Sequence, residues 1–167
     1  VAQGENSISI VDKGASAKDD SDDTAALLAA VEEAKASGKS VYIPEGRFNL
    51  DKQVNIEADN LKISGAGVWH TQLHFTSDKR YGGGIVFGHN SNGIELSNLY
   101  MDSNLTSRYN EDAQYKAISG TLGKDSKIHD IWVQHFEVGM WIGDYDQTGN
   151  MKYTDGLVVE NARIRNN

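Results

Sequence analysis

Hydrophobic side chains recur along this chain in one pattern: apolar, any, apolar, any, small or Asn/Asp, apolar, any, apolar. Such alternation is typical of short strands. Four segments fit it without gaps, and their first residues are 33, 32 and 31 positions apart. They are LKISGAGVW from Leu61, IELSNLYMD from Ile94, SKIHDIWVQ from Ser126 and LVVENARIR from Leu157.

The repeat predicts which side chains face inward. The three inward rows are Ile63, Leu96, Ile128 and Val159; Ala66, Leu99, Ile131 and Ala162; and Val68, Met101, Val133 and Ile164. Between the two short strands of each copy lies a bend, at Gly65, Asn98, Asp130 and Asn161. Gly, Asn and Asp tolerate the left-handed backbone that we expect at such a bend.

A second set of strands repeats in the same way. GGIVF, KAISG and GMWIG align Ile85, Ile118 and Met140, and the last two residues are 22 positions apart. The other spacings are longer because polar loops are inserted, one at 102–114 and one at 143–155. Matching inward residues in every copy favour stacked coils, and therefore a parallel β-helix. An antiparallel sandwich, the rival fold, would not require them.

One segment reads as a helix, SDDTAALLAAVEEAKASGKS. Ser21, Asp22 and Asp23 supply capping side chains, an apolar stripe includes Leu27 and Val31, and Gly38 is a natural stop. We expect this helix to cover the open edge of the first coil. The prediction is a single β-helix domain, with the cap helix and first strands in 1–50 and about four coils with inserted loops in 51–167.

The composition of the chain excludes some classes of binding partner. The net charge of −8 argues against nucleic acid and anionic membrane surfaces, and no apolar run is long enough to span a membrane. The chain has no cysteine, so disulfides do not stabilise it. It begins at Val1, which we interpret as a mature or trimmed product.

The outward positions indicate a sugar-binding face. The predicted outward rows are Gly67, Tyr100, Trp132 and Arg163, and beside them Trp69, Asp102, Gln134 and Arg165. Aromatic rings with groups that form directional hydrogen bonds suit a carbohydrate platform. The candidate substrate-binding residues are Trp69, Tyr100, Trp132 and, on the second set of strands, Trp141. The alternative is that these rings pack beneath inserted loops.

The second loop contains a possible calcium site. Asp144, Asp146, Thr148, Gly149 and Asp155 fit positions 1, 3, 5, 6 and 12 of a calcium-binding loop, although no helices flank them. The candidate metal ligands are Asp144, Asp146, Thr148 and Asp155, and a hydrogen-bonded polar turn is the alternative. A zinc site is not expected, because the repeat places no third ligand beside His70 and His74.

GASAKDDSDDTAALLAAVEEAKASGKSVYIPEGRFNL resembles the N-terminal cap and first strands of the pectate-lyase-like superfamily of right-handed parallel β-helices. Residues 63–75 and 138–167 further resemble the catalytic module of glycoside hydrolase family 87, the bacterial α-1,3-glucanases and mycodextranases. The resemblance implies inverting endo-hydrolysis of α-1,3-glucan by a secreted enzyme.

The resemblance also implies that the catalytic aspartates lie on coils beyond Asn167. We therefore assign no catalytic residue within the chain and expect it to be inactive alone. The expected partners are a glucan and the remaining C-terminal part of the enzyme, and no cofactor is required beyond a possible structural calcium. Two other functions remain open: a polysaccharide lyase, and a glycan-binding β-helix without catalysis, such as a tailspike or adhesin segment.

Overall fold

The computed structural model describes the whole chain except residues 1, 19, 106–113, 146–150, 153–155 and 166. The elements in chain order are β1 (Ser7–Ser9), η1 (Ile10–Lys13), α1 (Thr24–Ser37), β2 (Ser40–Ile43), β3 (Gly46–Leu50), β4 (Val54–Ile56), β5 (Lys62–Gly65), β6 (Thr71–Phe75), β7 (Ile85–Ser91), β8 (Glu95–Ser103), β9 (Lys116–Leu122), β10 (Lys127–Val133), β11 (Val138–Ile142), β12 (Asp144–Tyr145), β13 (Met151–Lys152) and β14 (Val158–Ile164).

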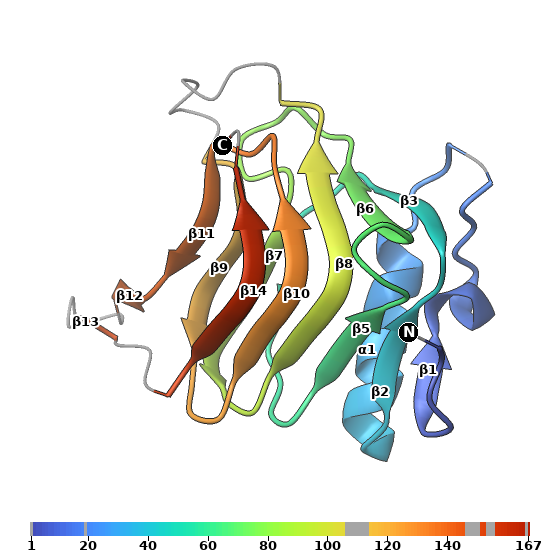
Figure 1. Ribbon diagram of the computed structural model, residues 1–167, viewed down its shortest axis with the longest axis horizontal. Helices are drawn as coiled ribbons and strands as arrows, with labels where there is room; N and C mark the ends of the chain where they lie inside the picture. Colours follow the sequence, from blue (N-terminus) through green and yellow to red (C-terminus); the bar gives the residue numbers. More distant parts are fainter. Residues whose placement is uncertain (1, 19, 106–113, 146–150, 153–155, 166) are drawn as a thin grey trace.

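The strands form a right-handed parallel β-helix, as predicted. One sheet has the order β1-β2-β5-β8-β10-β14, with β3 and β6 joined to it, and a second sheet has the order β11-β9-β7-β4. Figure 1 shows the two sheets as facing walls of one stack, with α1 at the N-terminal end. Every strand pair in the described residues is parallel except the β12–β13 hairpin. Parallel pairing excludes the antiparallel sandwich.

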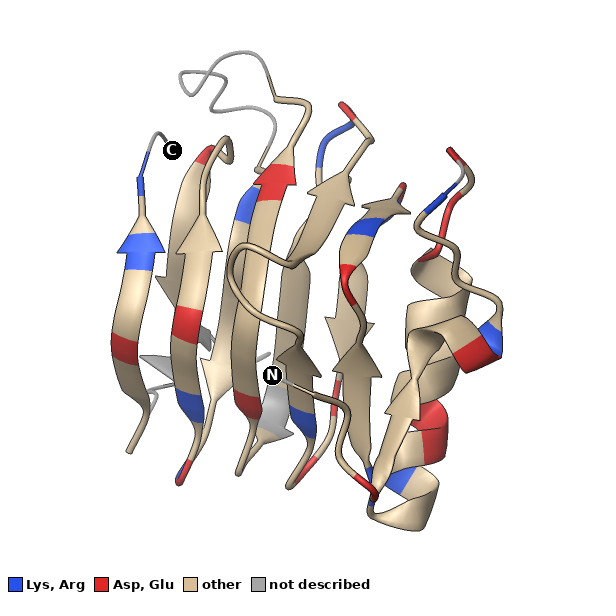
Figure 2. Ribbon diagram, turned by 45° about the vertical axis from the view of Figure 1, so that its right-hand side comes forward, with Lys and Arg blue, Asp and Glu red and all other residues tan. Residues whose placement is uncertain are grey.

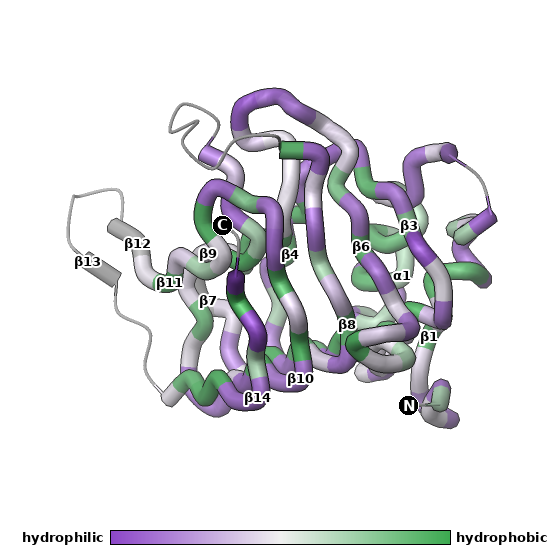
Figure 3. The backbone as a smooth tube through the Cα atoms, turned by 45° about the horizontal axis from the view of Figure 1, so that its top comes forward, coloured by the Kyte–Doolittle hydropathy of each residue, from purple (hydrophilic) through white to green (hydrophobic). Residues whose placement is uncertain are grey.

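The predicted inward rows hold over the last three coils. Leu96 pairs with Ile128 and Ile128 with Val159, while Met101 pairs with Val133 and Val133 with Ile164. On the second sheet, Ile118 pairs with both Ile85 and Met140, also as predicted. The tube in Figure 3 alternates between hydrophilic and hydrophobic residues along these strands. Alternation places one set of side chains in the interior and the other set outside.

In the coil that begins at Leu61, the predicted register holds for β5, where Ile63 pairs with Leu96, but is wrong after Gly65. Tyr100, Met101 and Asp102 pair with Gln72, Leu73 and His74 of β6, not with Gly67, Val68 and Trp69. Residues 66–70 leave the sheet between β5 and β6 as a loop. Leu73 and His74 take the places predicted for Val68 and Trp69, and in the loop Val68 is only partly buried and Trp69 is 76% exposed. We call residues 66–70 the Trp69 loop.

The bends are left-handed where the side chain is Asn or Asp. Asn98, Asp130 and Asn161 have φ values of 60°, 53° and 51°. Gly65 is an exception to the prediction, because its φ is not positive. A Cβ atom at Gly65 would lie 2.3 Å from the carbonyl oxygen of Asn98, so this position requires glycine for space.

Helix α1 covers the N-terminal end of the stack, as predicted. Its buried face includes Leu27, Ala30, Val31 and Ala34, and Gly38 ends it with φ of 73°. At its start the Asp22 carboxylate accepts hydrogen bonds from the Thr24 amide (3.0 Å) and from the Asp51 amide (2.9 Å) at the end of β3. No described helix is long and apolar enough to cross a membrane.

The last strand, β14, exposes side chains that the preceding coils bury. Val159 and Ile164 are 43% exposed, whereas Leu96 and Met101 in the same two rows are fully buried. Charged residues are sparse on the strands and gather at turns and on the outer side of α1 (Figure 2). The apolar face of β14 is therefore the largest departure from the pattern of the stack.

Candidate functional site: an aromatic pocket on the outer face

A pocket of about 330 Å³ lies on the outer face of the larger sheet, beside the Trp69 loop. Its lining comprises Gly46, Val68, Trp69, His70, Thr71, Gln72, Tyr100, Trp132 and Gln134. Successive strands supply Gln72 (β6), Tyr100 (β8) and Trp132 (β10), which pair in register. The pocket thus joins three of the four predicted substrate-binding residues.

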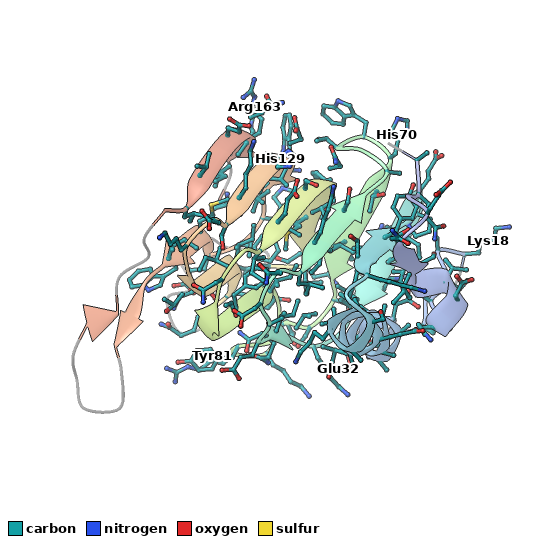
Figure 4. All side chains as sticks on the ribbon, turned by 90° about the horizontal axis from the view of Figure 1, so that it is seen from below. Lys18, Glu32, His70, Tyr81, His129 and Arg163 are labelled. Atoms are coloured by element: carbon teal, nitrogen blue, oxygen red, sulfur yellow. The ribbon has the colours of Figure 1, made fainter. Side chains whose placement is uncertain are left out.

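The Trp69 loop forms the raised side of the pocket. Its base is fixed, because the Gly67 amide donates to the Asn98 carbonyl (2.9 Å) and the Ala66 amide to the Thr71 hydroxyl (2.8 Å). The Trp69 ring lies 5.1 Å from that of Trp132, with a 53° angle between their planes. Figure 4 shows His70 of this loop, His129 and Arg163 projecting from one side of the molecule, and Tyr81 and Glu32 from the other.

The aromatic side chains are connected by hydrogen bonds. The Trp132 indole N–H donates to Oε1 of Gln134 (3.1 Å), and Nε2 of Gln134 donates to the Tyr100 hydroxyl (2.6 Å). The Tyr100 hydroxyl donates to Oδ2 of Asp102 (3.4 Å). Burial, together with the negative charge of Asp102, raises the pKa of Tyr100, so its hydroxyl stays protonated.

Asp102 lies on the same face of β8 as Tyr100, two residues further along, and accepts from two more donors. Its Oδ1 is 3.0 Å from Nε2 of Gln72 and 2.6 Å from Nδ1 of His74. Burial acts to raise the pKa of Asp102, but the hydrogen bonds from His74 and Gln72 outweigh burial and hold this pKa below its ordinary value. Asp102 is therefore ionised across the neutral range, and its carboxylate oxygens are occupied by His74, Gln72 and Tyr100.

The pocket lining carries little charge. Apart from His70, every lining residue is uncharged, and Nδ1 of His70 lies 3.8 Å from Glu45. Arginines stand in the same row, Arg47 next to Gln72 and Arg163 next to Trp132. The guanidinium of Arg165 lies 5.6 Å from the centre of the Trp132 ring. The arrangement offers aromatic faces and neutral hydrogen-bonding groups in the pocket, with cations at its margins.

Trp141 does not join this pocket. It lies on β11 in the other sheet, beside Ser119 of β9, and its ring is 56% exposed with Nζ of Lys116 at 4.7 Å. The sequence grouped four aromatic residues, and the structure separates this one from the other three.

Most of the predicted calcium loop lies outside the described residues. Asp146, Thr148 and Asp155 fall there, and of Asp144 only its backbone in β12 is described. Within the part of the chain that the structure describes, no group of three or more His, Asp or Glu side chains could hold a metal ion.

Gln72 and His74 are site residues that the sequence analysis missed. Both follow the Trp69 loop. The ungapped alignment of the repeats had put Gly67 and Trp69 beside Tyr100 and Asp102, where the structure has Gln72 and His74. The available signal was the alternation of Thr71, Leu73 and Phe75, which are all buried. The sequence analysis placed Trp69 in the outward row of Asp102, which it does not occupy. The Trp69 loop nevertheless places this side chain in the lining of the same pocket.

Residues 16–166 match the family model described as α-1,3-glucanase catalytic domain D2. The chain belongs to this family. It is thereby related to the glycoside hydrolase family 87 catalytic domains.

Solved structures of this family superpose closely. The Agl-KA catalytic domain is 45% identical with a TM-score of 0.91, over 100% of this chain and 30% of that one. The catalytic unit of a thermostable family 87 α-1,3-glucanase from Streptomyces thermodiastaticus is 27% identical with a TM-score of 0.75, over 96% and 26%. A family 87 domain bound to nigerose shares the fold at 22% identity and a TM-score of 0.66, over 88% and 24%.

A second group of relatives has a different named activity. Mannuronan C5-epimerase AlgE3 of Azotobacter vinelandii is 29% identical over 92% of this chain and 9% of its own length. The chain thus spans under a third of the solved glucanase domains, and about a tenth of this epimerase.

Proposed function

We propose that this chain contributes the N-terminal coils and a glucan-binding surface to an enzyme that hydrolyses α-1,3-glucan. The observation that carries this proposal is a neutral, aromatic-lined pocket in a member of the α-1,3-glucanase family. Flat apolar rings bind the faces of sugar rings, and Gln72 and Gln134 provide directional partners for hydroxyl groups. Trp69, Tyr100 and Trp132 are the proposed substrate-binding residues.

We further propose that the reaction is inverting and that its catalytic aspartates lie outside this chain. Inversion requires two carboxyl groups separated widely enough for a water molecule. Asp102, the carboxylate bonded to pocket residues, is already engaged by His74 and Gln72 and does not line the pocket. The exposed apolar row on β14 supports a further coil in the complete enzyme, supplied by the same polypeptide or by a second chain.

Replacing Trp132 by alanine tests the pocket. We expect W132A to weaken binding of an α-1,3-linked gluco-oligosaccharide about fivefold, because a stacked ring contributes on the order of 1 kcal/mol. Isothermal titration calorimetry measures this, and Trp141→Ala is the matched control because Trp141 lies on the other sheet. Equal losses in both variants would contradict this location for the site.

The lyase alternative concerns acidic sugars. Arg47 and Arg163 beside the pocket, and the similarity to mannuronan epimerases, favour an anionic substrate. The uncharged residues that dominate the lining favour a neutral one. Incubating the complete enzyme with α-1,3-glucan and with a polyuronide separates the two: reducing sugars from the glucan support hydrolysis, and unsaturated products from the polyuronide support a lyase. Glycan binding without any turnover would support the non-catalytic alternative.

A structural calcium ion at Asp144, Asp146, Thr148 and Asp155 and secretion of the enzyme also remain proposals. The proposal of calcium rests on the loop, which fits the calcium pattern at five positions. The proposal of secretion rests on the substrate, because a polymeric glucan requires an enzyme that acts outside the cell. Calorimetric titration with calcium after chelator treatment tests the ion. If calcium produces no heat of binding and no shift of the melting temperature, the calcium site is rejected. Enzyme detected only inside intact producing cells would reject secretion.

A further inference from the structure

The hydrogen bonds behind the aromatic pocket have a fixed direction from end to end. The indole N–H of Trp132 can only donate, and the ionised carboxylate of Asp102 can only accept. Gln134 must therefore turn its oxygen toward Trp132 and its amide nitrogen toward Tyr100, at 3.1 and 2.6 Å. The Tyr100 hydroxyl accepts a hydrogen bond from Gln134 and donates its own O–H to Asp102.

Asp102 is well placed to hold this direction without contacting a ligand. Its side chain is 13% exposed, and it does not line the pocket. Behind it, His74 is also fixed, because Nε2 lies 2.8 Å from Oδ1 of Asn104, whose amide donates to the carbonyl of Thr76 (3.2 Å). Asp102 is thus held by His74 and Gln72 of the neighbouring strand β6 and accepts from Tyr100 of its own strand.

We propose that Asp102 is a positioning residue, which orients Tyr100 and Trp132 for glucan binding through Gln134. The part that concerns glucan rests on the proposed function of the pocket. With its proton committed to Asp102, Tyr100 presents an oxygen lone pair to the pocket, while Gln134 retains one N–H for a sugar hydroxyl. An amide in place of the carboxylate removes the acceptor of the Tyr100 O–H. When this O–H turns to Gln134 instead, the Gln134 amide must rotate, and its NH₂ group then faces the Trp132 N–H donor to donor.

Asp102→Asn tests this role, with two readouts. Trp69 and Trp132 are close enough for exciton coupling, so circular dichroism reports their relative orientation, and the indole N–H resonance of Trp132 reports its hydrogen bond. We expect D102N to reduce the coupling, to shift that resonance and to weaken oligosaccharide binding about tenfold. Tyr100→Phe interrupts the same series of bonds at its middle and should produce the same changes, and D102N should add little to it.

The matched control is Asp130→Asn. Asp130 is also a strand carboxylate bonded to a histidine, with Oδ2 2.6 Å from Nδ1 of His129, but it has no contact with the pocket. We expect D130N to leave the coupling, the Trp132 resonance and sugar binding unchanged. Loss of thermal stability in D102N with an unchanged coupling and resonance would overturn the proposal, because Asp102 would then be only structural. If the wild-type chain binds no glucan, the proposed function fails, and the spectra still decide whether Asp102 orients the two rings.

Discussion

His129 shows how single side chains join neighbouring coils. Its Nδ1 is 2.6 Å from Asp130 of the same strand and its Nε2 is 2.8 Å from Glu95 of β8, while Asn161 of β14 donates to Asp130. Burial acts to lower the pKa of His129, but the hydrogen bonds with Asp130 and Glu95 outweigh it and raise this pKa. One imidazole thereby connects β8 to β10 when it is protonated.

This raised pKa gives stability a defined pH dependence. The folded state binds the His129 proton more tightly than the unfolded state, so its contribution is complete below the unfolded pKa of about 6.5 and is lost as pH rises through the folded value. We therefore expect His129→Gln to lower the melting temperature more at about pH 5 than at about pH 9. Thermal melts at the two pH values measure the difference. His70→Gln, at an exposed histidine, is the control, and an equal effect of H129Q at both pH values would contradict the assignment.

At the scale of elements, the sequence predicts a strand best where its neighbours bury the same row. Ile63, Leu96 and Ile128 align because each fills the same interior position. The Trp69 loop was missed because Ala66 and Val68 imitate the apolar alternation of a strand, and periodicity cannot show that a segment leaves the sheet. The pocket residues Tyr100 and Trp132 could be predicted from their row, whereas Gln72 and His74 required the true register.

The start of α1 gives a prediction at the same scale. Asp22, one residue before the N-cap Asp23, accepts from Thr24 at the first position of the helix and from Asp51 just after β3, so it fixes the start of the helix and attaches it to the stack. We expect Asp22→Ala to lower the free energy of unfolding by about 1–2 kcal/mol, the usual effect of losing a capping side chain. Chemical denaturation measures it. Asp20→Ala, just before the cap, is the comparison, and an equal loss there would show that the effect is not specific to the cap.

For the whole molecule, the two ends of the stack differ in how they are finished. Helix α1 covers one end, whereas β14 carries Ile164 at 43% exposure in the row where Met101 is fully buried. Truncating Met101 and Ile164 to alanine therefore tests whether another coil covers each of these side chains.

We expect Met101→Ala to cost about 2–5 kcal/mol, as truncations in a packed core do. Ile164→Ala should cost less than about 1 kcal/mol in this chain, because its side chain is already partly in contact with water. Denaturant titrations of both variants provide the comparison. In the complete enzyme, we expect the cost of Ile164→Ala to approach that of Met101→Ala, and a cost that stays small there would contradict a further coil on β14.

Parallel stacking also determines when the chain can begin to fold. Within the two large sheets, the closest pairings still join residues 22 positions apart, as in Val41 with Ile63 and Ile118 with Met140. Contacts this distant in sequence require closure of a long loop before they contribute free energy, which slows folding. Helix α1 forms its own hydrogen bonds between residues close in sequence, and each coil presents an unpaired strand edge to the next. Folding should therefore start at the N-terminal cap and proceed one coil at a time, so that the aromatic pocket is completed only after three coils are in place.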